Sequence, residues 1–274
     1  MFDELRKIPV FVVRDFRMLF TYKLAFSMSF FTIIINLFYL VLFGSMFALA
    51  PGSLPNVPSA YEGTFIYYIL VGSIGWGFMW SIMNATSLSL STEMMMGTLE
   101  SILVTSTRMY TLMLSYAIFG CLFGLLQIVI LILVGSLIFN IAVFATATIY
   151  TLVIFILSII MMTGFGMIFG GLTVWLKNIG ETVPLIQNIA MFFCGVYFAI
   201  DVLPEAIRPV SKFIPFYYPI EGLRRSLDPA ASSSDLMFYV IILTILSVIF
   251  VAIGVFVLHK GLNKAKKDGT LSFY

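Results

Sequence analysis

Few side chains of this 274-residue chain could carry out chemistry. The single histidine, His259, borders an apolar run, and the two cysteines, Cys121 and Cys194, lie inside apolar runs with no histidine beside them. No group of residues has the spacing of metal ligands, and no pair of aspartates falls inside an apolar run, as an intramembrane protease would need. We therefore predict no catalytic residue and no metal site, and we expect both cysteines to be small buried residues.

The most informative polar segment runs from Glu93 to Thr105. It lies between residues 63–92 and 109–176, two stretches without a charged side chain. The chain therefore leaves its apolar surroundings for only about four helical turns, and the segment carries carboxylates at Glu93 and Glu100. A docking element for a partner is one interpretation. Two glutamates that only solvate a loop are the other.

The residues within this segment suit a sharp turn followed by a short helix. Gly97 can end one helix and redirect the chain. Thr98 can cap the following helix. The Glu100 carboxylate is favourable near a helix N-terminus, where an arginine of a partner could reach it.

The composition places the chain in a membrane. Hydrophobic residues make up 61% of the chain and charged residues only 10%, and the mean hydropathy is +1.08, whereas a soluble domain has roughly a quarter charged residues. The apolar runs reach about twenty residues or more, the length of a membrane-spanning helix, and they lack the alternation of membrane β-strands. The net charge of +2 gives no reason to expect nucleic acid as a partner.

We predict an all-α integral membrane protein with six transmembrane helices. Residues 1–23 place apolar side chains at three- and four-residue spacing with charged ones between them, which predicts an amphipathic helix lying in the membrane interface. This segment has no apolar core or cleavage site, so we do not expect a signal peptide. The expected transmembrane domain covers residues 24–258, with spans at about 24–49, 63–87, 109–139, 146–175, 182–200 and 236–258.

The distribution of lysine and arginine predicts the orientation. Under the six-span arrangement eleven of them fall on one side and four on the other, so the positive-inside rule puts both termini in the cytoplasm. Residues 88–108 and the tail 259–274 are then cytoplasmic, and residues 201–235 form an outer loop. This loop holds five of the ten prolines together with several aromatic side chains, which favours short helices at the outer leaflet.

Two stretches resemble the permease subunits of type 2 ABC exporters. The cytoplasmic stretch reads Glu93-x-x-x-Gly97-Thr98-Leu99-Glu100-x-x-Leu103-x-Thr105. The outer stretch reads Gly195-Val196-Tyr197-Phe198-x-x-x-Val202-Leu203-Pro204-x-x-Ile207-Arg208, and it continues to Ile214-Pro215 and Glu221-x-Leu223-Arg224-Arg225. The order of an interfacial helix, six spans and a long outer loop before the last span extends the resemblance over nearly the whole chain.

The resemblance implies that ATP binding and the path through the membrane belong to different subunits. The chain has no Gly-x-x-x-x-Gly-Lys-Ser/Thr phosphate loop, so ATP and Mg²⁺ would be bound by two separate ATPase subunits. A second permease copy would complete the path through the lipid; a homodimer is the simpler expectation and a heterodimer the alternative. The implied ATPase-coupling residues are Glu93, Gly97, Thr98, Leu99, Glu100 and Thr105. Three methionines, Met94 to Met96, stand where the family commonly has charged residues, which predicts a more apolar docking face.

The resemblance also implies candidates for a substrate path and an outer gate. The path would run past the second and fifth spans, although each amide could instead bond a neighbouring helix and each aromatic ring could face lipid. The candidate path residues are Asn36, Trp76, Trp80, Asn84, Tyr197 and Phe198. The candidate residues of the outer gate and loop are Leu203, Pro204, Arg208, Pro215 and Glu221.

We therefore expect the permease of an ATP-driven exporter in the plasma membrane, moving a drug, lipid, peptide or glycoconjugate. The alternative within transport is a secondary carrier or channel, which is disfavoured because no Asp, Glu, Lys or Arg lies well inside a span. The alternative outside transport is an ABC-associated protein of signalling or envelope remodelling. The short outer loops disfavour that alternative.

Overall fold

The computed structural model describes residues 2–48, 65–105, 107–139, 146–176, 182–196, 200, 205 and 208–268. Every regular element within these ranges is helical, which confirms the all-α prediction for this part of the chain. The helices are α1 (Phe2–Thr21), α2 (Lys23–Ala48), α3 (Phe65–Met95), α4 (Thr98–Val104), α5 (Met109–Phe139), α6 (Ile149–Leu176), α7 (Thr182–Phe193), α8 (Arg208–Phe213), α9 (Tyr217–Ser226) and α10 (Ser233–Asp268).

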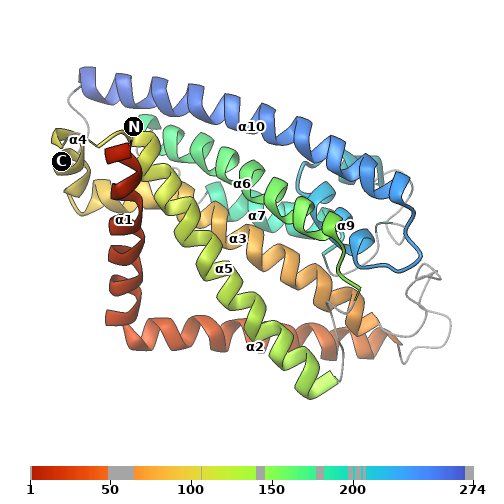
Figure 1. Ribbon diagram of the computed structural model, residues 1–274. Helices are drawn as coiled ribbons and strands as arrows, with labels where there is room; N and C mark the ends of the chain where they lie inside the picture. The colour runs from red at the N-terminus through yellow and green to blue at the C-terminus, as the bar shows by residue number, and fades with distance from the viewer. Residues whose placement is uncertain are drawn as a thin grey trace.

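The long helices lie side by side in a bundle (Figure 1). The central helix α3 contacts α5, α6 and α9, and α10 packs along α6. The start of α1, the short helix α4 and the end of α10 gather at one end of the bundle, whereas α9 and the start of α10 lie at the other. These two ends are called the α4 end and the α9 end below.

Three helices among the described residues are long and apolar enough to cross a membrane: α5, α6 and α10. The bent pair of α1 and α2 could count as a fourth span, so the predicted count of six is not confirmed. α7 has 12 residues and extends only about 18 Å of the roughly 30 Å needed. α3 has 31 residues, but its central position lets it carry glycine, serine, tyrosine and tryptophan against other helices, and these lower its hydropathy.

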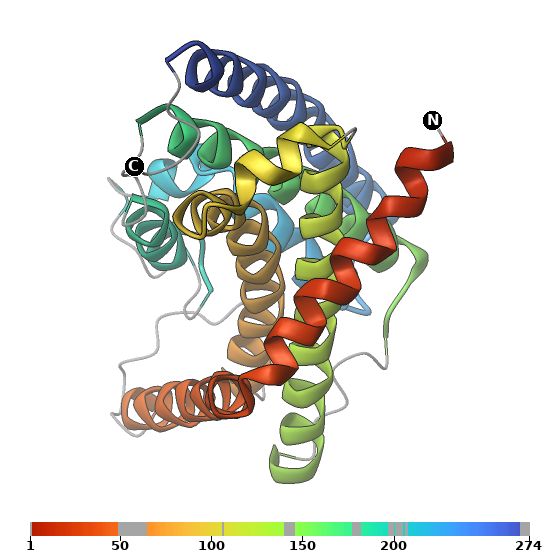
Figure 2. The same cartoon turned by 90° about the vertical axis from the view of Figure 1, so that its left-hand side faces the viewer.

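α1 lies across the α4 end, nearly at right angles to the long helices (Figures 1 and 2). The axes of Glu4–Thr21 and Phe26–Tyr39 differ in direction by 81°. One face of α1 packs against α5 and buries Val12, while Val10 and Phe20 are exposed. An interfacial helix that precedes a span needs this geometry, and the position of α1 in the membrane interface stays a prediction.

Glycines let α6 and α10 approach each other to backbone contact. A Cβ atom added to Gly164 would lie 2.6 Å from a backbone carbon of α10, and one added to Gly171 would lie 2.7 Å from another. Gly254 and Gly261 of α10 face the backbone of α6 in the same way. Small residues commonly bring membrane helices this close, so the glycines explain why α10 can follow α6 over such a length.

We expect Gly164→Ala to lower the free energy of unfolding by about 2 kcal/mol, because the new methyl group forces two helix backbones apart. Gly77→Ala is the matched control, since its Cβ would meet no atom nearer than Gln127 Oε1 at 3.9 Å. Titration of the detergent-solubilised variants with dodecyl sulfate, followed by circular dichroism, measures both effects. Equal stability of the two variants would contradict tight packing between α6 and α10.

Candidate functional site

The predicted coupling segment forms a sharp turn and a short helix at the α4 end. α3 ends at Met95, and Gly97 follows with a left-handed backbone at a φ of 69°, a conformation that an L side chain would strain. α4 then runs over Thr98–Val104 and ends at Thr105, whose amide and hydroxyl both donate to a carbonyl of its last turn. The prediction that Gly97 redirects the chain is confirmed.

The predicted capping role of Thr98 is wrong. Gly97 occupies the position before α4 and makes no side-chain cap, and Thr98 is already the first helical residue. The Thr98 hydroxyl instead donates to the Glu93 carboxylate, and it lies 3.2 Å from the Glu93 main-chain carbonyl. Because the left-handed glycine completes the turn one residue early, Thr98 bonds α4 back to α3.

Glu93 is the buried centre of a polar group formed by Arg14, Glu93, Thr98 and Tyr116, called the Glu93 cluster below. Glu93 is only 7% exposed. Arg14 Nη2 and Tyr116 Oη each donate to Glu93 Oε1 at 2.6 Å, and Thr98 bonds Oε2. One carboxylate on α3 therefore joins α1, α4 and α5. This carboxylate can position α4, whereas its predicted contact with an ATPase stays a prediction.

The Glu93 cluster favours the ionised carboxylate. Burial by itself would raise the pKa of Glu93, but the hydrogen bonds from Thr98 and Tyr116 and the charge of Arg14 outweigh burial and hold the pKa below its ordinary value. Asp15 lies next to the cluster and accepts from Arg14 Nε at 2.9 Å. Desolvation raises the pKa of Asp15, and its bond to Arg14 opposes this rise. Two carboxylates thus share one guanidinium.

The opposite face of α4 is exposed. Leu99 is completely buried and anchors the helix, while Glu100 and Val104 face outward. Met95 and Met96, in the preceding turn, are 70% and 58% exposed. These four exposed residues, Met95, Met96, Glu100 and Val104, are called the α4 surface below. Three of them are apolar and one is charged, and Thr98, Ser101 and Thr105 beside them are exposed as well.

A second group of bonds holds α1 against the start of α5. Glu4 Oε2 accepts from the Arg108 amide at 3.1 Å and from the Thr111 hydroxyl at 2.8 Å, and Lys7 Nζ pairs with Oε1 at 2.8 Å. The bond from Lys7, followed by those from Arg108 and Thr111, lowers the pKa of Glu4 to about 2. Helix α1 is therefore bonded to Arg108 and Thr111, at the start of α5.

At the α9 end, Arg224 is a buried cation that is 2% exposed. Its Nη1 donates to Tyr68 Oη at 2.7 Å and its Nη2 donates to the Val196 carbonyl at 2.8 Å. The guanidinium carbon also lies 3.6 Å from the centre of the Tyr68 ring, and Glu221 Oε2 lies 3.7 Å from Nη1. These residues, called the Arg224 clamp below, join α9 to α3 and to the turn after α7.

The predicted residues of the outer gate fall in different places. Glu221 takes part in the Arg224 clamp, Arg208 begins α8, and Pro215 is half-buried between α8 and α9. Leu203 and Pro204 lie outside the described residues. A gating role for these five stays a prediction.

The aromatic candidates for the substrate path lie partly in the core. Trp76 is 7% exposed and packs against Trp80 and against Phe216 of the outer segment. Tyr197 and Phe198 lie outside the described residues. The aromatic contacts join the middle of α3 to the chain just before α9, and they do not by themselves define a path.

The two amide candidates lie on different helices, Asn36 on α2 and Asn84 on α3. Asn36 is exposed on α2, and its Nδ2 donates to the Thr32 carbonyl of the same helix at 2.9 Å. Asn84 lines a cavity between α1, α3 and α5. Among the described candidates, Trp76, Trp80 and Asn84 follow one another at four-residue spacing on α3, whereas Asn36 lies on α2 and bonds within its own helix.

Sequence analysis assigned no role to four residues whose side chains form the Glu93 cluster and the Arg224 clamp. They are Arg14, Tyr68, Tyr116 and Arg224. Arg224 was visible within the outer motif, but its spacing gave no sign of a partner on α3. Arg14 was visible as a basic residue in a predicted interfacial helix, and the tyrosines gave no signal beyond their type.

The described part of the chain is an all-helical bundle in which three helices are long and apolar enough to cross a membrane, which defines an integral membrane protein. The model of the ABC-2 type transporter family matches residues 10–227, which include the Glu93 cluster, α4 and the Arg224 clamp. The match covers more than half of the chain, so the chain belongs to this family, whose members are the permease components of type 2 ABC transporters. A comparison with curated proteins finds no match.

Membership of this family confirms the resemblance predicted from the two motifs. The family is a non-catalytic component of a transporter, and it associates with ABC ATPase subunits and a partner permease.

Proposed function

We propose that this chain is the permease of an ATP-driven exporter in the plasma membrane, and that its substrate is hydrophobic or amphiphilic: a drug, lipid, peptide or glycoconjugate. The observation that carries the proposal is the α4 surface, an exposed face with three apolar side chains and one carboxylate that the Glu93 cluster bonds to the bundle. A partner that moves α4 would move α1, α3 and α5 with it, because a single buried carboxylate joins all four helices.

Two ATPase subunits and a second copy of this permease complete the proposed exporter. The ATPases bind ATP and Mg²⁺, since this chain has no phosphate loop. A homodimer is proposed ahead of a heterodimer because one chain can supply both halves of a symmetric path. Both termini are proposed to be cytoplasmic, because the end of α10 carries Lys266 and Lys267 in its last turn and lies at the α4 end.

The α4 surface suits an ATPase partner in two ways. Met95 and Met96 offer flexible, polarizable side chains that can adapt to a docking cleft. Glu100 adds one exposed carboxylate in the first turn of α4, where a guanidinium of the ATPase could bond it in a charge-assisted pair. The apolar contacts would supply affinity and the charged pair would fix the orientation.

Glu100→Ala is expected to uncouple ATP hydrolysis from transport. The side chain is exposed, so its loss should leave the fold intact but remove one charge-assisted contact, worth about tenfold or more in productive docking. Vesicles containing the permease and its ATPase should hydrolyse ATP while transport of a fluorescent amphiphile falls by about that factor. Asp235→Ala, which removes an exposed carboxylate at the α9 end, is the control. Wild-type transport by Glu100→Ala would count against this role.

A further inference from the structure

A cavity of about 280 Å³ lies between α1, α3 and α5, close to the α4 end. One part of its wall is polar and includes Arg14, Asp15 and Glu93. The other part is apolar and includes Leu88 of α3 and Phe119 of α5. A cavity with one polar and one apolar wall suits an amphiphile better than it suits water alone.

The charges in the polar wall do not balance. Arg14 is the single cation among the lining residues, and it lies 2.8 Å from Asp15 Oδ1 and 2.6 Å from Glu93 Oε1. Asp15 Oδ2 is buried and has no hydrogen-bond partner within the described part of the chain. A carboxylate oxygen accepts hydrogen bonds, so a ligand that brings both an N–H donor and a positive charge would complement this wall.

A divalent metal ion does not meet this requirement. Calcium needs six to eight oxygen ligands and magnesium an octahedral set, whereas both carboxylates are already bonded to Arg14. Among the described residues, no three His, Cys, Asp or Glu side chains gather in a group that could hold a metal. An ammonium group needs fewer partners and brings its own N–H donors.

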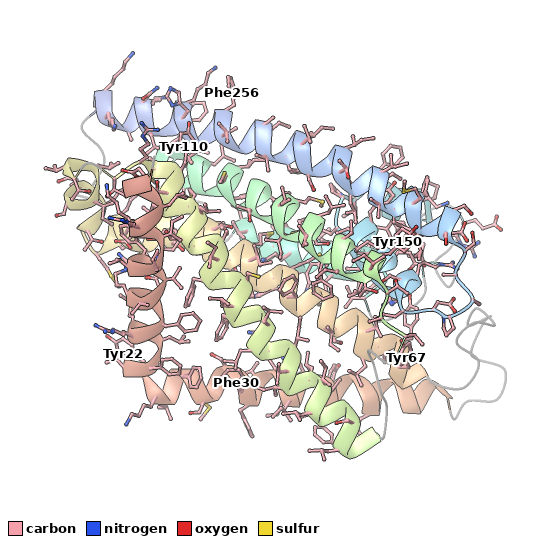
Figure 3. All side chains as sticks on the ribbon, in the orientation of Figure 1. Tyr22, Phe30, Tyr67, Tyr110, Tyr150 and Phe256 are labelled. Atoms are coloured by element: carbon pink, nitrogen blue, oxygen red, sulfur yellow. The ribbon has the colours of Figure 1, made fainter. Side chains whose placement is uncertain are left out.

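The size and position of the cavity indicate a lipid head group. The volume of about 280 Å³ falls just below the roughly 300–1,000 Å³ that encloses a whole small-molecule ligand, so it fits a head group with its chains outside. Met18 and Tyr22, which also line the cavity, are 42% and 66% exposed. Figure 3 shows Tyr22 where α1 meets α2. Acyl chains leaving past these residues would meet the exposed apolar side chains of α2, such as Phe31.

We propose that this cavity binds the primary ammonium head group of an aminophospholipid, which donates to the Asp15 carboxylate. The lipid comes from the leaflet at the α4 end, which is the inner leaflet in the orientation proposed above. A choline head group is a poor substitute, because its methylated nitrogen has no N–H to donate. The bound head group lies beside Arg14 and Glu93, so the lipid contacts the same residues that hold α4.

Native mass spectrometry of the full chain in detergent tests this site. The probes are dioleoyl phosphatidylethanolamine and dioleoyl phosphatidylcholine in equal amounts, which differ only in the head group. Wild type should retain the ethanolamine lipid about tenfold over the choline lipid, the ratio that one charge-assisted hydrogen bond supplies. Asp15→Asn should bring this ratio close to one. Asp235→Asn, the same change at an exposed carboxylate of the α9 end, should leave it unchanged.

Met18→Trp tests the site without changing a charge. Met18 is partly exposed, so a larger ring there should block the cavity and remove the preference for the ethanolamine lipid while the chain still folds. If Asp15→Asn does not give a single folded species in gel filtration, Met18→Trp decides alone. Equal retention of the two lipids by wild type, or an unchanged preference in Met18→Trp, would overturn the proposal.

Discussion

Arg224→Lys should destabilise the chain more than Arg224→Met, even though lysine keeps the positive charge. Methionine removes two charge-assisted hydrogen bonds and the contact with the Tyr68 ring, but it also removes the cost of burying a charge, so we expect a net loss of about 2 kcal/mol. Lysine leaves a cation in a site that is 2% exposed and cannot bond both Tyr68 Oη and the Val196 carbonyl while lying on the ring. That buried, poorly bonded charge should cost about 3–5 kcal/mol.

Dodecyl sulfate titrations of wild type, Arg224→Met and Arg224→Lys give the free energies of unfolding that test this ranking of stabilities. Arg225→Met is the matched control, because the Arg225 side chain is 41% exposed and pairs with Glu221 at 3.2 Å; exposed pairs of this kind contribute less than about 1 kcal/mol. If Arg224→Lys is as stable as wild type, the charge alone holds the α9 end and the planar guanidinium is not needed.

The labelling rate of the Cys194 thiol measures local opening of the chain near the Arg224 clamp. Cys194 is 1% exposed and lies two residues before Val196, whose carbonyl Arg224 bonds. Maleimide labelling of Cys194 in a Cys121→Ser background should therefore speed up in both Arg224 variants, because the turn after α7 opens more often. Unchanged labelling alongside a lower global stability would place the effect of Arg224 elsewhere.

The two polar centres lie at opposite ends of one helix. Tyr68 of the Arg224 clamp and Glu93 are separated by 25 residues of α3, which corresponds to about 37 Å. Between them α3 is packed against α5 and α6. Helix α3 is therefore bonded at both ends and packed along its length, and it directly joins the α4 end to the α9 end.

Local patterns in the sequence predicted the parts of the structure that depend on local causes. The long uncharged stretches predicted apolar helices because a bilayer requires internally bonded backbone. Gly97 predicted a turn because a glycine tolerates the left-handed backbone found there. The two motifs predicted the family, which the match over residues 10–227 confirms.

The parts of the structure that the sequence did not predict depend mainly on partners distant in sequence. Arg14 and Glu93 are 79 residues apart, and Arg224 and Tyr68 are 156 residues apart, so no spacing rule could pair them. Nothing in the sequence indicated that Glu93 is buried, because a carboxylate in a polar segment is normally solvated. Its burial depends on α1, which folds across the α4 end. The fifth span was expected to reach residue 200 because apolar composition does not mark where α7 ends, at Phe193.

Arg14 and Glu93 should be energetically coupled. Glu93→Gln leaves Arg14 with a weaker acceptor, and Arg14→Met leaves a carboxylate that is only 7% exposed without its cation. Removing both should therefore cost less than the sum of the two single changes, with a coupling energy of about 1–3 kcal/mol. The free energies of unfolding of wild type, the two single variants and the double variant give this value.

The pair Glu4–Lys7 is the control for this cycle. These residues lie three positions apart on α1, at 2.8 Å, and the main-chain and hydroxyl bonds of Glu4 do not involve Lys7. Glu4→Gln and Lys7→Met should be coupled much more weakly than the changes at Arg14 and Glu93. A similar coupling in both cycles would mean that the Glu93 cluster is no stronger than an ordinary helix-surface pair.

The coupling between Arg14 and Glu93 should also depend on pH in one direction. The folded pKa of Glu93 lies below its ordinary value of 4.5, so its contribution to stability is complete above about pH 4.5 and is lost as the pH falls through the folded pKa. The stability difference between wild type and Glu93→Gln should shrink over that acid range.

Glu93 variants should impair both stability and coupling to the ATPase, because α4 loses its bond to α3, whereas Glu100→Ala should impair coupling alone. Unimpaired stability in Glu93→Gln would mean that the buried Leu99 is enough to hold α4 in place.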